Sequence, residues 1–141
     1  EAQKLYRERT SMLQTHQILG LVTLGLMTGA YFTSRADQPA RPIHQIFGYT
    51  AAATYAATAY FSLTAPEPVG FSEKGWGMKI HRALLFVHLP GMILAPIAGY
   101  MANRDLKKGK RLTGLAAYKS TLANVTYFSF AAAALSVTLN F

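Results

Sequence analysis

Four long apolar stretches alternate with short polar connections along the chain. They cover about residues 11–34, 42–65, 78–102 and 112–140, and only a few charged residues interrupt them. Each stretch has the roughly 20 residues that a membrane-spanning helix needs. The pattern therefore predicts four transmembrane helices within a single domain over residues 1–141.

The connections are too short for neighbouring helices to be parallel. The predicted fold is an all-α membrane protein, an antiparallel up-down bundle of four transmembrane helices. A soluble bundle would carry a charged stripe on every helix, and these segments carry none. We call face A the end at which the first and third helices begin, and face B the opposite end.

Composition supports a membrane protein. Hydrophobic residues make up 51% of the chain and charged residues only 14%, with 14 Lys+Arg against 6 Asp+Glu. Because the basic residues lie between apolar stretches, they predict contact with a lipid bilayer and no nucleic-acid partner. Slightly more of them fall on face B, which favours a cytoplasmic face B and non-cytoplasmic termini, as in a bacterial inner-membrane protein.

Several kinds of chemistry are excluded. The chain has no cysteine, which rules out disulfides, iron–sulfur clusters and covalently attached haem. It also has no glycine-rich phosphate loop and no carboxylate within an apolar stretch. We therefore predict no catalytic residue and expect a subunit of an oxidoreductase complex more than a stand-alone enzyme.

An internal repeat carries two of the histidines. The first helix contains His16-Gln-Ile-Leu-Gly20 and the second His44-Gln-Ile-Phe-Gly48, at an offset of 28 residues (44 − 16). Residues four apart share a helix face, so Gly20 and Gly48 leave a flat space beside each imidazole. A planar macrocycle needs such a space.

All four histidines, His16, His44, His81 and His88, lie within the predicted helices. Ionisable groups in a bilayer are costly and mark function by default. Haem iron readily takes axial histidine. The alternatives are neutral imidazoles that hydrogen-bond neighbouring helices, or histidines that bind a pigment such as chlorophyll.

Depth in the membrane limits how these histidines can pair. His16 lies toward face A, and both His81 and His88 are at depths from which they can meet it. His44 opens its helix on face B, where its partner would be Lys119, Met101 or none. Lys119 also fits a lysine that extends its ammonium group to the lipid headgroups.

Three basic residues flank these histidines. Lys79 and Arg82 lie beside His81, and Arg41 precedes His44. They fit partners for haem propionates and equally fit ordinary membrane anchors.

The four antiparallel helices and the His-Gln-Ile-x-Gly openings resemble the cytochrome b561 family and its bacterial four-helix relatives. This resemblance implies one or two haem b groups, with His16 and His81 holding the haem near face A and His44 holding one near face B. It also implies electron transfer across the membrane. The fourth helix departs from the family, because Tyr118 or Lys119 stands where a histidine is expected.

The expected function is that of a membrane-integral b-type haem subunit. It would exchange electrons between quinol and a redox partner, together with other subunits of a membrane redox complex. The alternative is a non-catalytic structural or pigment-binding membrane subunit.

Overall fold

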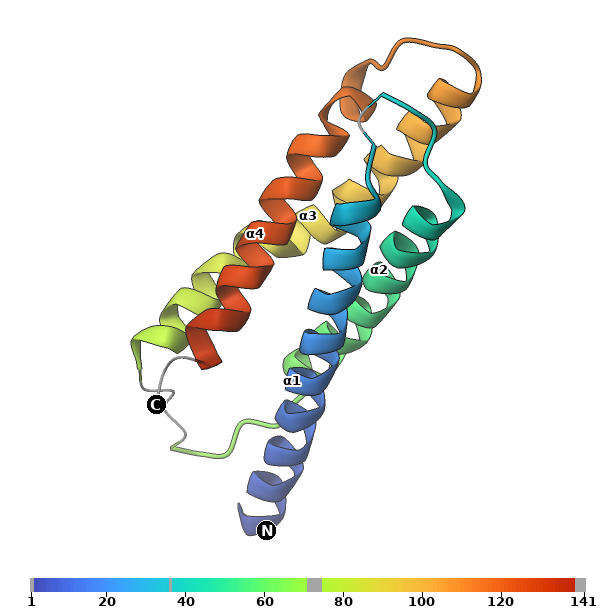
Figure 1. The fold of residues 1–141 in the computed structure, drawn as a ribbon. Coiled ribbons are helices and arrows are strands. Elements are labelled where there is room, and N and C mark those ends of the chain that lie inside the picture. The colour runs from blue at the N-terminus through green and yellow to red at the C-terminus, as the bar shows by residue number, and fades with distance from the viewer. Residues whose placement is uncertain (1, 36, 71–74, 139–141) are drawn as a thin grey trace.

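The computed structural model of the chain describes residues 2–35, 37–70 and 75–138, and these form an all-helical bundle (Figure 1). The elements are α1 (Ala2–Thr33), α2 (Pro42–Leu63), α3 (Trp76–Lys107), a short 3-10 helix η1 (Gly114–Tyr118) and α4 (Lys119–Thr138). Four α-helices in the predicted order are confirmed. Residues 139 and 140, placed in the fourth helix by the sequence pattern, lie outside the described residues.

The bundle consists of two hairpins. α1 packs along α2 and α3 packs along α4, whereas the two pairs contact each other much less (Figure 1). Small residues allow the close approach within each pair. The Cα of Gly29 faces the ring of Phe47, and Gly91 lies directly against the side chain of Thr126.

The helix ends differ from those expected from hydropathy. α1 begins at Ala2, well before residue 11, because its first turns consist largely of charged and polar residues that favour helix. α3 extends beyond residue 102 to Lys107 for the same reason. Residues 112 and 113, predicted as helical, are not, and the fourth segment starts at Gly114 as the 3-10 helix η1, because the φ of 57° at Gly114 does not fit a regular helix.

The interior is small and partly polar. Its apolar cluster contains Met27, Ala51, Tyr55, Met92 and Phe130. Buried among these are polar side chains, namely Thr23, Thr58, His88, Thr126 and Ser129.

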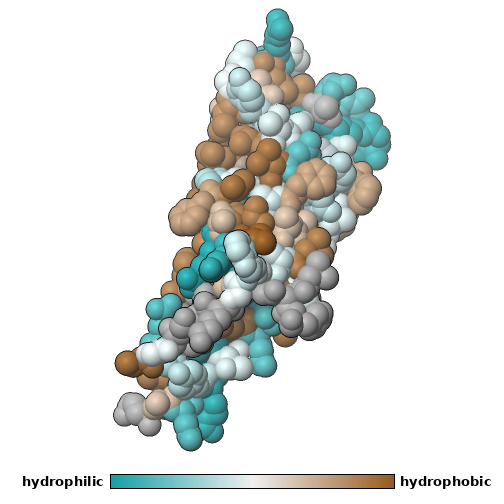
Figure 2. Space-filling view, turned by 90° about the vertical axis from the view of Figure 1, so that its left-hand side faces the viewer, coloured by the Kyte–Doolittle hydropathy of each residue, from teal (hydrophilic) through white to brown (hydrophobic). Residues whose placement is uncertain are grey.

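The outer surface, by contrast, carries many large apolar side chains (Figure 2). Phe86 is 81% exposed, Phe32 79% and Ile18 64%. A partly polar interior beneath an apolar surface is an arrangement that a lipid environment favours. Among the described helices, α3 and the segment Gly114–Thr138 are long and apolar enough to cross a membrane.

The contact between Gly91 and Thr126 gives a stability prediction. Gly91→Ala places a methyl group on the stiff, β-branched Thr126 side chain, so we expect a loss of about 1–3 kcal/mol in unfolding free energy. Gly25→Ala is the matched control, because no atom lies within 4 Å of the added methyl. Thermal unfolding of the detergent-solubilised variants measures both, and equal midpoints would contradict the packing described.

Candidate functional site

His16 of α1 and His81 of α3 face each other across the two hairpins. Their ring centroids are 6.1 Å apart and their planes are nearly perpendicular, at 83°. From the sequence, either His81 or His88 could pair with His16. In the structure, His81 lies next to His16.

Each of these rings is held by a backbone carbonyl of the adjacent helix in its own hairpin. His16 Nδ1 donates to the Thr58 carbonyl at 2.9 Å, and His81 Nδ1 donates to the Ala133 carbonyl at 3.0 Å. Since a carbonyl can only accept, Nδ1 carries the proton and Nε2 of the neutral ring keeps its lone pair. Among the described residues, neither Nε2 has a hydrogen-bond partner, so both rings present a metal-binding nitrogen.

His44 repeats this arrangement at face B. Its Nδ1 donates to the Ala30 carbonyl at 2.9 Å. His44 follows His16 by 28 residues, and the acceptor Thr58 of His16 follows Ala30 by the same 28. The repeat is therefore a structural symmetry of the α1–α2 hairpin, in which each copy holds the histidine of the other.

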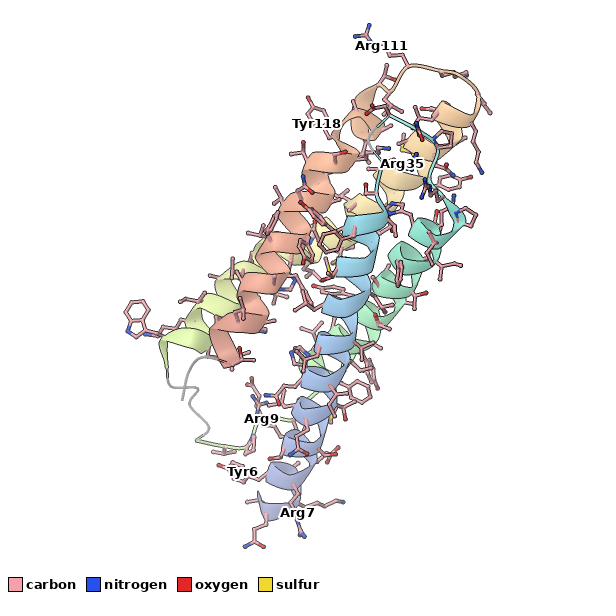
Figure 3. All side chains as sticks on the ribbon, viewed as in Figure 1. Tyr6, Arg7, Arg9, Arg35, Arg111 and Tyr118 are labelled. Carbon is pink, nitrogen blue, oxygen red and sulfur yellow. The ribbon has the colours of Figure 1, made fainter. Side chains whose placement is uncertain are left out.

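The α3–α4 hairpin repeats this register, and Lys119 of α4 occupies the position that His44 occupies in α2. Ala133 follows Thr58 by 75 residues, and Lys119 follows His44 by 75. Lys119 Nζ donates to the Arg35 carbonyl at 3.1 Å. Figure 3 shows Arg35 in the connection at the face B end of the bundle, so the lysine extends toward that end.

A groove opens beside His44. Its cavity volume is about 160 Å³, which is below the roughly 300–1,000 Å³ usual for cofactor sites. Its wall is largely apolar and includes Ala30, Gly48, Ala95, Pro96, Gly99, Tyr100, Ala123 and Tyr127. Neither Lys119 nor Met101, the two side chains considered as partners of His44, lines the groove, whereas Met92 does.

His88 lies apart from the His16–His81 pair, in the bundle core. It is only 3% exposed, and a 2.8 Å hydrogen bond joins its Nδ1 to the Tyr55 hydroxyl. Its Nε2 is buried and has no partner among the described residues. The Phe130 ring packs edge-on against it, with centroids 5.2 Å apart.

The accessory residues divide into two groups. Gly48 lines the groove and has open space where a Cβ would stand, while a Cβ on Gly20 would meet Thr58 Cγ2 at 3.8 Å. The flat space predicted beside the imidazole is thus present at Gly48 and is bounded by Thr58 at Gly20. Three basic residues, Arg41, Lys79 and Arg82, are exposed near the helix ends.

Two features escaped the sequence analysis. Arg9 is 6% exposed and donates to the Pro66 carbonyl at 3.1 Å, which ties the first turns of α1 to the connection after α2 (Figure 3). The hydrogen bond between Tyr55 and His88 was also not predictable, because the position of a tyrosine in the sequence does not indicate which side chain its hydroxyl will meet. The 28-residue repeat, by contrast, relates the two acceptor carbonyls, Thr58 for His16 and Ala30 for His44, within the antiparallel α1–α2 hairpin.

No family model, curated protein or solved structure matches this chain. The resemblance to the cytochrome b561 family therefore stays a prediction carried by the residues described above.

The Tyr55–His88 bond is testable by stability. Tyr55→Phe removes the hydroxyl and leaves a second nitrogen of His88 buried without a partner, which should cost about 1–3 kcal/mol of unfolding free energy. Tyr60→Phe on the same helix is the control, because Tyr60 is 60% exposed. Unfolding midpoints in detergent report the difference, and a Tyr55→Phe midpoint no lower than that of Tyr60→Phe refutes the bond.

Proposed function

We propose that this chain is a membrane-integral electron-transfer subunit that binds b-type haem between His16 of α1 and His81 of α3. The observation that carries the proposal is the pair of imidazoles 6.1 Å apart, each fixed through Nδ1 by a backbone carbonyl. Ligand histidines characteristically donate their second nitrogen to such an acceptor, which fixes the tautomer and ring orientation.

The separation of the rings fits two axial ligands of one metal. With metal–imidazole bonds of about 2 Å and roughly 1 Å from nitrogen to ring centre, the two centroids would lie roughly 6 Å apart. Among the described residues, no group of three or more His, Asp or Glu side chains could hold a metal ion. Two histidines alone therefore suit a metal that brings its other ligands with it, as haem iron does.

The proposal includes a membrane setting for all four helices. Two segments, α3 and Gly114–Thr138, have the length and hydropathy of membrane spans, and the α1–α2 hairpin lies beside the hairpin that they form. The apolar side chains on the outside extend to these helices, with Ile18 at 64% and Ile46 at 61% exposed. Lipid chains would cover these side chains, which water would not favour at this density.

Haem supplies a reversible one-electron couple when bound. The chain's own residues would determine how that couple is used. His16 and His81 would hold the iron from both sides, which would leave no position on it for substrate and would suit the bound haem to electron transfer. The carbonyls of Thr58 and Ala133 polarise the two Nδ1–H groups, which makes the imidazoles more basic and favours the oxidised state.

The electron donor and the electron acceptor would both bind at face A. Lys79 and Arg82 are exposed near His81, where they can pair with haem propionates or with an acidic partner surface. A quinol or a redox protein would exchange electrons there. Because the described chain is almost entirely helical bundle, we propose that it works with other subunits of a membrane redox complex.

The test is an absorption spectrum of the purified protein with its native cofactors. Dithionite reduction should produce the sharp α band of b-type haem. His16→Ala and His81→Ala should each lower the haem content and change the spectrum of the haem that remains, because the one imidazole left can ligate the iron from one side only.

Matched controls are available on the same helices. Gln17→Ala and Ile80→Ala change exposed neighbours of the two histidines and should retain the full band. A spectrum without a haem band, or with chlorophyll bands, contradicts the proposal and favours a structural or pigment-binding subunit. A haem content unchanged in both histidine variants shows that the site is misassigned.

A further inference from the structure

We propose that the groove beside His44 binds one anionic phospholipid, whose phosphate lies among Arg35, Arg41 and Lys119 and one of whose acyl chains occupies the groove. This inference rests on the membrane setting of the proposed function and is independent of haem. It assigns a lipid ligand to face B, the end of the bundle opposite the His16–His81 pair.

Positive charge is concentrated at face B. The basic side chains at this end are Arg35, Arg41, Arg104, Lys107, Lys108, Lys110, Arg111 and Lys119, and the acidic ones are Asp37 and Asp105. Asp105 is paired with Arg104 at 3.2 Å, and Asp37 is near enough to Lys119 to interact with it electrostatically. The cations greatly outnumber the anions, so this end attracts anionic headgroups.

Two of the arginines lie at the mouth of the groove. Ser34 and Ala40 both line the groove, and the residues that follow them in the chain are Arg35 and Arg41. Both arginines are exposed. Arg35 Nη1 donates to Gln38 Oε1 at 2.6 Å, which leaves the other N–H groups of this guanidinium for a further acceptor. Guanidinium groups bind phosphate through paired hydrogen bonds.

Lys119 reaches the same mouth from α4. It precedes Ala123, which lines the groove, by four positions, so the two share a helix face and Lys119 is one turn nearer face B. Its ammonium group donates to the Arg35 carbonyl at 3.1 Å. Since an ammonium group has three N–H donors, others remain for a phosphate oxygen.

Two hydrogen bonds between the hairpins hold the mouth of the groove in place. The bond from Lys119 to the Arg35 carbonyl joins α4 to the α1–α2 connection. The Ala40 amide donates to Asn103 Oδ1 at 2.9 Å, which joins the same connection to α3. The segment that carries both arginines is therefore tied to both helices of the opposite hairpin, and a ligand there orders little new structure.

The polarity of the groove changes with depth. Gln45, Tyr100 and Asn124 line the part nearer face B, and their amide and hydroxyl groups can donate to ester carbonyls. Met27 and Met92, which belong to the apolar core cluster, line the deeper part. The order of cations, neutral donors and apolar wall matches the order of phosphate, esters and acyl chain in a phospholipid.

The groove is open to the side of the bundle. Tyr49 of α2 and Tyr100 of α3 both line it and are 49% and 59% exposed. In the proposed membrane setting, this side faces lipid, so an acyl chain can enter directly from the bilayer.

Size and charge favour a phospholipid over the other amphiphiles of a membrane. The cavity of about 160 Å³ is small for a bulky cofactor, which favours a flexible chain over a macrocycle. A quinol can use the same neutral donors, but its uncharged ring gains little from three cations at the mouth. A phosphate gains a charge-assisted contact from each.

The experiment measures phospholipid binding to the purified, delipidated full chain in a neutral detergent. Native mass spectrometry counts the bound lipids, and the thermal unfolding midpoint follows the titration. Phosphatidylglycerol should bind at one molecule per chain and raise the midpoint. Phosphatidylcholine with the same acyl chains, or inorganic phosphate alone, should do neither at the same concentration.

Variants at the mouth test the role of the cations. Lys119→Gln and Arg35→Gln should each weaken phosphatidylglycerol binding roughly tenfold, because each removes one charge-assisted contact and keeps a polar side chain. Lys108→Gln and Arg111→Gln are the matched controls, since both residues are exposed at the same end but lie on the α3–α4 connection, from which no described residue lines the groove. They should bind the lipid as the unaltered chain does.

A third pair of variants tests the groove itself. Gly99 lines the groove and has no atom within 4 Å of an added Cβ, so Gly99→Leu should fold, fill the groove and abolish binding. Gly25→Leu is the control, because the same space is open there but Gly25 does not line the groove. Unfolding midpoints without added lipid verify that both variants are folded.

Four outcomes overturn the inference. Equal binding of phosphatidylcholine means that the cations do not select the lipid, and equal weakening in Lys108→Gln means that only the general positive charge of face B acts. An equal response to inorganic phosphate means that no acyl chain is needed. A quinol or haem retained in place of the lipid identifies a different occupant.

The same variants separate this inference from the proposed function. The haem band assigned to His16 and His81 should be unchanged in all of them, because that pair lies at the other end of the bundle. A chain that binds phosphatidylglycerol selectively but holds no haem contradicts the proposed function alone. A chain that holds haem but does not select the lipid contradicts this inference alone.

Discussion

The hydrogen bond from a histidine Nδ1 to a carbonyl of the neighbouring helix is the interaction on which the whole account depends. It occurs three times, at His16, His44 and His81, with distances of 2.9, 2.9 and 3.0 Å. Each bond fixes one ring nitrogen as the donor and leaves the other free. It also joins the two helices of a hairpin, so the same contact stabilises the fold and orients the candidate ligand.

This interaction explains the division of the bundle into two hairpins. Within each hairpin, histidine–carbonyl bonds and glycine contacts such as Gly91 on Thr126 bring the helices close together. Between the hairpins, contact is sparse, and there the free nitrogens and the groove are found. A planar cofactor between the hairpins would supply the packing that the side chains do not.

Much of the fold was predictable, because hydropathy and short connections determine the number, order and direction of the helices. The sequence could not choose between His81 and His88, since residues seven apart share one helix face. The choice depends on partners on other helices, the Ala133 carbonyl for one ring and the Tyr55 hydroxyl for the other. The groove and the burial of Arg9 were equally invisible, because both depend on where distant segments meet.

The claim that two imidazoles on different hairpins share one iron is tested most directly by electron paramagnetic resonance of the oxidised protein. Measuring His44→Ala isolates the His16–His81 site. Because these ring planes are 83° apart, the account predicts a low-spin ferric signal of the strongly anisotropic kind that perpendicular axial imidazoles produce. A high-spin signal alone, or a low-spin signal that survives His81→Ala, would contradict it.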